Sequence, residues 1–126
     1  MKTFSHKHIV VKDEIDDLNH VNNVIYLQWI NDVSKLHWLL LSNDEINKKF
    51  IWVAIRHEID YLKPAFLAEE ITLKTWISTL KGVKSIRNVE IYREDTLLAK
   101  SKTTWCLLDA TTQRITRITK EIEGLF

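Results

Sequence analysis

The sequence contains few of the residues that break or cross-link a chain. Its 126 residues include two glycines, one proline and one cysteine, Cys106. So little glycine and proline predicts long elements joined by short or polar connections. A single cysteine excludes an intrachain disulfide and suits a reducing compartment. Its place in the apolar-rich stretch TTWCLLD favours a packed thiol over a nucleophile.

Neither sign of charge dominates, and long apolar runs are missing. Eighteen Lys and Arg against seventeen Asp and Glu give a formal net charge of +1, so composition offers no support for a nucleic-acid partner. The first eleven residues have only the three-residue apolar run Ile9–Val11, and nothing later approaches the length of a membrane span. We therefore expect a cytoplasmic protein without membrane association. Its length predicts one domain, residues 1–126.

Tryptophan, by contrast, is abundant. The five tryptophans are spread along the chain, at Trp29, Trp38, Trp52, Trp76 and Trp105. This spread predicts a large core or a buried association surface rather than one aromatic binding patch.

Residue patterns predict one strand and one long helix in the first part of the chain. The strand is expected over Thr3–Lys12 and the helix over Asn23–Ser42. Polar residues of the helix fall on one narrow stripe, and most of its remaining surface is apolar. We therefore expect other structure to surround this helix. The polar segment 42–50 is expected to add a helical turn or two.

Everything after Phe50 has the composition of strands. We expect four of them, rich in β-branched and aromatic residues, over residues 51–63, 71–79, 85–93 and 97–109. The connections FLAEE, LKGVK and EDT are short enough for hairpins, which predicts antiparallel pairing. A curved sheet wrapped around the helix is the simplest way to bury that helix.

The junction before the helix is unusually polar. The stretch DDLNHVNN, Asp16–Asn23, holds two acids, a histidine and three asparagines. One capping residue would be enough to start a helix, and Asn22 or Asn23 supplies it. The surplus polarity predicts a functional site at the helix N-terminus. The alternative for Asp16 is a plain turn acid, and the alternative for His20 is a bond to a neighbouring carbonyl.

This junction resembles that of the hotdog-fold thioesterases, in particular the 4-hydroxybenzoyl-CoA thioesterase-like proteins and the plant acyl-ACP thioesterases. Asp16, the run His20-Val21-Asn22-Asn23, Tyr26 and Trp29 are similar to the family's motif. Residues 59–65 (IDYLKPA) resemble its turn after the second strand, and residues 114–121 its closing segment. The chain departs from the pattern at Asn19, where glycine is common, and at Leu18, where the plant enzymes have a catalytic asparagine.

The resemblance implies an α+β hotdog fold, a curved antiparallel sheet wrapped around one long central helix. It also implies hydrolysis of acyl thioesters, either acyl-CoA or acyl-carrier protein, at a site shared between two subunits. The acyl chain is expected beside the central helix. The assembly implied is a homodimer or a homotetramer.

The residue types at the junction suit this chemistry. Asp16 is predicted to be either the nucleophile or the general base, since a carboxylate is competent for both roles. The backbone N–H groups of Asn23 and Val24, at the positive end of the helix dipole, are predicted to stabilise an oxyanion, with His20 assisting. Water is the second substrate, so no cofactor or metal is expected.

Further residues are predicted to contact the substrate: Asn19, Asn22, Tyr26, Trp29, Glu58, Arg114 and Arg117. The alternatives are core packing for Tyr26 and Trp29 and a solvated or ion-paired surface for the charged residues. Two other function classes stay open. One is a non-hydrolytic, dehydratase-like enzyme with His20 as base, and the other is a catalytically silent acyl-CoA binder.

Overall fold

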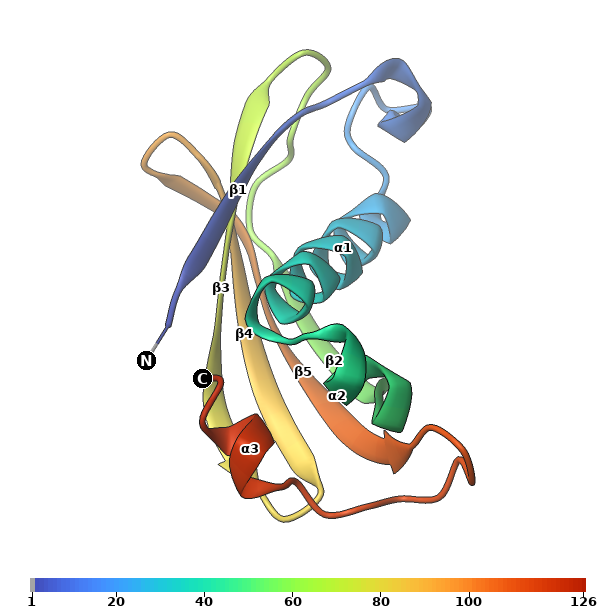
Figure 1. Cartoon of the computed structure of the whole chain (residues 1–126). Coiled ribbons are helices and arrows are strands. Elements are labelled where there is room, and N and C mark those ends of the chain that lie inside the picture. Colours follow the sequence, from blue (N-terminus) through green and yellow to red (C-terminus); the bar gives the residue numbers. More distant parts are fainter. Residues whose placement is uncertain (1) are drawn as a thin grey trace.

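The computed structural model describes residues 2–126 and contains one five-stranded sheet with a long helix, α1, on one face (Figure 1). The strands are β1 (Phe4–Ile9), β2 (Phe50–Tyr61), β3 (Glu70–Lys81), β4 (Lys84–Arg93) and β5 (Thr96–Asp109). The helices are α1 (Asn23–Leu41), α2 (Asp44–Lys49) and α3 (Lys120–Glu123), with a 3₁₀ turn η1 (Lys12–Glu14). The predicted α+β class and the central helix are confirmed.

The sheet is antiparallel throughout, in the order β1-β3-β4-β5-β2. The predicted hairpins β3–β4 and β4–β5 are confirmed. The predicted hairpin through FLAEE is wrong, because β2 pairs with β5 and is separated from β3 by two strands, β4 and β5. The connecting segment instead passes the start of α1, where the Ala65 carbonyl accepts a hydrogen bond of 2.9 Å from the Val21 N–H.

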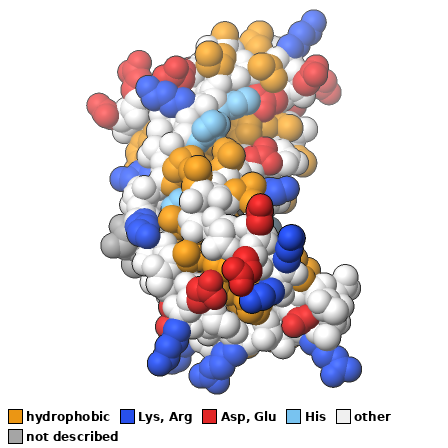
Figure 2. All heavy atoms as spheres, viewed as in Figure 1, with side chains coloured by type: hydrophobic (Ala, Val, Ile, Leu, Met, Phe, Trp, Pro, Cys, Tyr) orange, Lys and Arg blue, Asp and Glu red, His pale blue; other side chains and the backbone are white. Residues whose placement is uncertain are grey.

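Helix α1 begins and ends within one residue of the predicted bounds. The Asn22 side chain caps it by accepting from the Val24 N–H at 3.1 Å. One face of the helix packs on the sheet through Tyr26, Trp29, Ile30, Val33, Ser34 and His37. The expectation that other structure surrounds α1 is wrong for the single chain, since apolar side chains of α1 stay exposed at Val24, Leu36, Leu39 and Leu40. Figure 2 shows hydrophobic side chains at the surface over this helix.

The period-two pattern of the late strands correctly predicts the inner face of the sheet. Ile71, Leu73, Thr75 and Ile77 of β3 are all buried, as predicted. Ile71 and Leu73 belong to the larger of two core clusters, which also includes Val89, Ile91 and Ala99. This face therefore fixes which side chains meet the helix.

Two boundaries differ from the prediction. The first strand ends at Ile9, because the chain turns into η1 where Val10 and Val11 were expected to continue it. The segment after β5 contains α3, which the strand-only prediction missed; the Thr119 hydroxyl caps it by accepting from the Ile122 N–H at 3.2 Å. Within residues 2–126, no helix is long and apolar enough to cross a membrane.

Candidate active site

Asp16 lies in a tight turn directly before α1. Its Oδ1 accepts hydrogen bonds from the backbone N–H groups of Leu18, at 2.9 Å, and His20, at 3.2 Å. Its own N–H donates to the His20 carbonyl at 2.8 Å. Both the backbone and one carboxylate oxygen are therefore fixed. Among residues 2–126 no donor contacts Oδ2, which leaves this oxygen of a half-buried carboxylate available for chemistry.

Asn19 closes this turn in a left-handed backbone conformation, with a φ of 65°. Its N–H donates to the Asp16 carbonyl at 3.1 Å. Glycine adopts this conformation without strain, and asparagine is among the few other residues that tolerate it. A glycine, which the resemblance leads one to expect at this position, would fit the same backbone. The exposed Asn19 side chain is not needed to explain the turn.

The first turn of α1 provides fewer open donors than the sequence predicted. The Val24 N–H is occupied by the Asn22 side chain. The Asn23 N–H has no acceptor among the residues described. The Asn23 N–H is therefore the first candidate for an oxyanion donor. The Val24 N–H can serve only if it shares or breaks its hydrogen bond to the Asn22 side chain.

The segment after β2 packs against this junction, so the two sequence motifs come together in space. The Tyr26 hydroxyl accepts from the Ala65 N–H at 3.0 Å, and burial raises the pKa of Tyr26. The Tyr61 hydroxyl donates to the Asn23 carbonyl at 3.2 Å, and its ring packs edge-on against Tyr26 at 5.4 Å. These contacts fix the start of α1 from the side of β2.

The His20 ring lies over the same segment. It packs edge-on against Phe66, with ring centroids 5.3 Å apart. Its backbone takes part in the Asp16 turn through both the N–H and the carbonyl. His20 therefore has an evident structural role beside any catalytic one.

Glu14 connects the segment before Asp16 to β1 and to α1, a role that the sequence did not predict. Its carboxylate accepts from the Val11 N–H at 2.9 Å and the Trp29 Nε1 at 2.8 Å, and the His8 Nε2 lies 2.8 Å away. Burial alone would raise the pKa of Glu14, but these hydrogen bonds together hold it below its usual value. The available signal was its N3 position in η1, from which the carboxylate reaches back to the N-cap backbone.

Three predicted contact residues lie away from Asp16 within the chain. Glu58 is on the outer face of β2, paired with Lys102 in register and ion-paired with Arg56, whereas α1 covers the inner face. Arg114 and Arg117 are exposed on the segment after β5, at the end of the molecule opposite to the 12–22 connection (Figure 1). The remaining predicted residues, Asn19, Asn22, Tyr26 and Trp29, are all at the junction or in the first two turns of α1.

An antiparallel five-stranded sheet packed on one face against a long central helix is the hotdog fold, and solved structures share this fold. The chain is similar to the probable thioesterase YbaW from Escherichia coli (23% identity, 96% of this chain and 94% of that chain, TM-score 0.83). It is similar to SAV2348 from Staphylococcus aureus, solved in complex with CoA (17%, 98% and 81%, 0.87). It is also similar to Slr0204, a 1,4-dihydroxy-2-naphthoyl-CoA thioesterase from Synechocystis (16%, 98% and 95%, 0.84).

The family follows from the sequence itself. The profile of the acyl-ACP thioesterase N-terminal domain matches residues 1–126, so the chain belongs to this family of hotdog-fold thioesterases. No curated protein sequence matches the chain significantly.

Proposed function

We propose that this protein hydrolyses acyl thioesters, with Asp16 as the reacting carboxylate. The main support is the geometry of that residue. Two backbone N–H groups fix Oδ1, while Oδ2 has no donor among residues 2–126. The Asn23 N–H, which has no acceptor among residues 2–126, lies at the other end of the same short connection. A held carboxylate and a preset donor are the two parts that thioester hydrolysis requires.

Two routes are compatible with this arrangement. In the first, Oδ2 attacks the carbonyl carbon and expels the thiolate, and water then hydrolyses the mixed anhydride. In the second, the carboxylate takes a proton from a water molecule whose oxygen attacks the carbonyl, and the tetrahedral intermediate expels the thiolate. In both routes the Asn23 N–H would donate to the developing oxyanion, a contribution of roughly 3 kcal/mol for one such donor. A thiol with a pKa of about 8.5 leaves without a strong general acid.

The proposed substrate is an acyl group on a pantetheine thiol, in CoA or in a carrier protein. The family is that of acyl-ACP thioesterases, and the similar Staphylococcus aureus protein binds CoA. The side chains of Tyr26, Trp29 and Asn22 would shape the site around the thioester, and Asn19 would do so through its left-handed backbone. Arg114 and Arg117 would reach it only from a second subunit, and Glu58 has no part in the proposed site.

We propose a homodimer formed through β2. A tetramer would consist of two such dimers. Strand β2 is an edge of the sheet and exposes Ile51, Val53 and Ile55. An unpaired edge with apolar side chains is a template for pairing with another strand. The other edge, β1, exposes mainly polar side chains, Ser5, His6 and Lys7. The C2 axis of a homodimer would therefore run beside β2.

Thiol release tests the proposed activity. The wild type would be incubated with short, long and aromatic acyl-CoAs and with acyl-carrier protein, and free thiol followed with a chromogenic disulfide. Release well above the uncatalysed rate from at least one substrate is expected. Binding without release from any substrate would contradict the proposal and favour a silent acyl-CoA binder. Turnover of an acyl-CoA without thiol release, dependent on His20, would favour a dehydratase-like enzyme.

A further inference from the structure

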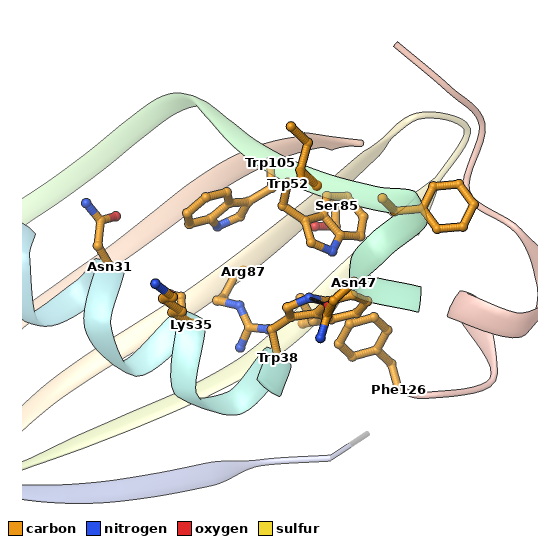
Figure 3. Close-up of a pocket in the computed structure, with 13 residues that line it drawn as sticks. Asn31, Lys35, Trp38, Asn47, Trp52, Ser85, Arg87, Trp105 and Phe126 are labelled. Carbon is orange, nitrogen blue, oxygen red and sulfur yellow. Dashed lines mark hydrogen bonds between the residues drawn. The ribbon is translucent and has the colours of Figure 1, made fainter. Parts of the chain in front are cut away.

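A cavity of about 430 Å³ lies between the C-terminal half of α1 and the sheet, apart from the Asp16 turn (Figure 3). Asn31, its lining residue nearest to the start of α1, is eight residues along the helix, a rise of about 12 Å. Five of its thirteen lining residues are aromatic, namely Trp38, Trp52, Trp105, Phe50 and Phe126. Three of the five tryptophans thus meet at one place, contrary to the expectation that they form no single aromatic patch.

Arg87 of β4 lies at this cavity and is only 4% exposed. Its Nη1 donates to Thr75 Oγ1 at 3.0 Å and lies 2.8 Å from His37 Nδ1. Burial, together with the charge of Arg87, lowers the pKa of His37 to about 4, so this imidazole is neutral and accepts the hydrogen bond. Burial also lowers the pKa of Arg87 to about 10, which leaves the guanidinium charged at pH 7.

The charge of Arg87 has no counter-ion among the residues that the structure describes. Among residues 2–126 no carboxylate forms an ion pair with Arg87, and the residues that line the cavity include no Asp or Glu. The cavity adds a second cation, Lys35. Buried charges in proteins are normally paired, because leaving one unpaired costs several kcal/mol. The cavity is therefore suited to an anion.

Two more polar groups of the cavity lack partners. Trp105 Nε1 and Asn31 Oδ1 are buried and make no hydrogen bond within residues 2–126. Such atoms are rare, since the large majority of buried polar groups are hydrogen-bonded. The indole N–H can only donate, and the Asn31 amide can donate or accept. In Figure 3 the side chains of Arg87, Trp105 and Trp38 converge on the space between α1 and the sheet.

We propose that this cavity binds a compact organic carboxylate. Its flat or cyclic apolar body would lie between the tryptophan rings, and its carboxylate would accept hydrogen bonds from Arg87 and Trp105 Nε1. Charge-assisted bonds of this kind are about twice as strong as neutral ones. The volume falls within the range of roughly 300–1,000 Å³ that is usual for small-molecule sites. An uncharged alkyl chain would leave the Trp105 Nε1–H without an acceptor and the charge of Arg87 without a counter-ion.

Two sources supply this chemistry. One is a free carboxylic acid. The other is a carboxylate at the far end of the acyl group of a thioester substrate, an option that rests on the proposed function. Binding of the free acid does not depend on hydrolysis, so it is the primary test.

Tryptophan fluorescence reports binding directly, because three indoles line the cavity. The protein would be titrated with cyclohexanecarboxylate and with the isosteric, neutral cyclohexanecarboxamide. The acid is expected to bind at least tenfold more tightly than the amide. Arg87→Met should remove this difference, and Trp105→Phe, which keeps a flat ring without the N–H, should weaken acid binding several-fold. Circular dichroism would verify that each variant is folded.

Equal affinity for acid and amide, no binding of the acid, or unchanged acid binding by folded Arg87→Met would overturn the proposal. If Arg87→Met does not fold, unchanged acid binding by Trp105→Phe would overturn it instead. The sources are separated by thiol release from an acyl-CoA with a terminal carboxylate and from its methyl ester. If the wild type releases thiol faster from the acyl-CoA with the terminal carboxylate than from its methyl ester, and Arg87→Met does not, the cavity binds the acyl group. Equal rates of release from the two assign the cavity to a free acid. Absence of release from both of these acyl-CoAs also assigns the cavity to a free acid, whereas the proposed function is contradicted only if no acyl thioester releases thiol.

Discussion

The indole Nε1 of Trp29 donates a hydrogen bond of 2.8 Å to the carboxylate of Glu14. Through this bond the second turn of α1 is tied to η1, two residues before Asp16. The same carboxylate contacts His8 of β1 and accepts from the Val11 N–H. Glu14 thus joins three elements and fixes the path by which the chain enters the Asp16 turn.

Glu14→Gln is expected to destabilise the protein by about 1–3 kcal/mol, because bonds to a charged acceptor are replaced by weaker ones. Since the pKa of Glu14 is lowered from its ordinary value of 4.5, its contribution is present above that value and is lost as the pH falls through the folded pKa. Urea unfolding at pH 7 and at pH 3.5 would measure both effects. The exposed Glu123→Gln serves as control, and equal stability of the two variants would contradict the assigned role.

Asn19→Gly is expected to keep stability and thioesterase activity close to those of the wild type, because the left-handed backbone suits glycine. Asn19→Ala should lose roughly 1 kcal/mol or more, since alanine is strained at this φ. Thermal unfolding and thiol release would be compared for both variants. If the glycine variant is stable but inactive, the Asn19 side chain contacts the substrate, as the sequence predicted.

Stability is expected to fall between pH 6.5 and about 4 because of His37. His37 has its ordinary pKa of 6.5 in the unfolded chain, whereas its pKa in the folded protein is about 4. The contribution of His37 is therefore complete above pH 6.5 and is lost as the pH falls towards 4. His57, whose pKa burial also lowers, adds to this loss. His37→Gln should show a smaller decrease in melting temperature over this range, and a decrease equal to that of the wild type would contradict the assignment.

Ile55→Lys is expected to dissociate the proposed dimer. Ile55 is 52% exposed on β2, where a second subunit would cover it. A lysine on an edge strand opposes pairing with another strand. Sedimentation velocity would compare this variant with Ile115→Lys, which changes a 65% exposed residue outside the named strands. A wild type that is monomeric at micromolar concentration would contradict the dimer.

The sequence predicted the parts of the fold that depend on local periodicity. The apolar pattern after Asn23 predicted α1, and alternation predicted the buried face of β3. Pairing of β2 with β5 was not predictable, because a short connection permits a hairpin without requiring one. The choice depends on how residues 62–69 pack against Tyr26 and Val21, which are contacts distant in sequence.

The sequence located the Asp16 junction but gave no prediction of the separate cavity at Arg87. The spacing from Asp16 to Trp29 located the junction, since local turn and helix geometry bring those residues together. Arg87 and His37 escaped notice because each has a plain sequence context. One signal was present: alternation along β4 places Arg87 on the same face as Ser85, Val89 and Ile91, all of which are buried. A charged residue on a buried strand face is a reason to search for its partner.

The most direct test of Asp16 is to compare Asp16→Asn with Asp17→Asn. The asparagine oxygen at position 16 can still accept from the Leu18 and His20 N–H groups, so the turn should persist while the carboxylate is lost. Asp17 is an exposed neighbour, and its asparagine variant makes the same chemical change. With the best acyl thioester found for the wild type, kcat/KM should fall at least a hundredfold in Asp16→Asn and stay within a few-fold in Asp17→Asn. Equal activity of the two variants, both folded, would contradict the assignment of Asp16 as the reacting carboxylate.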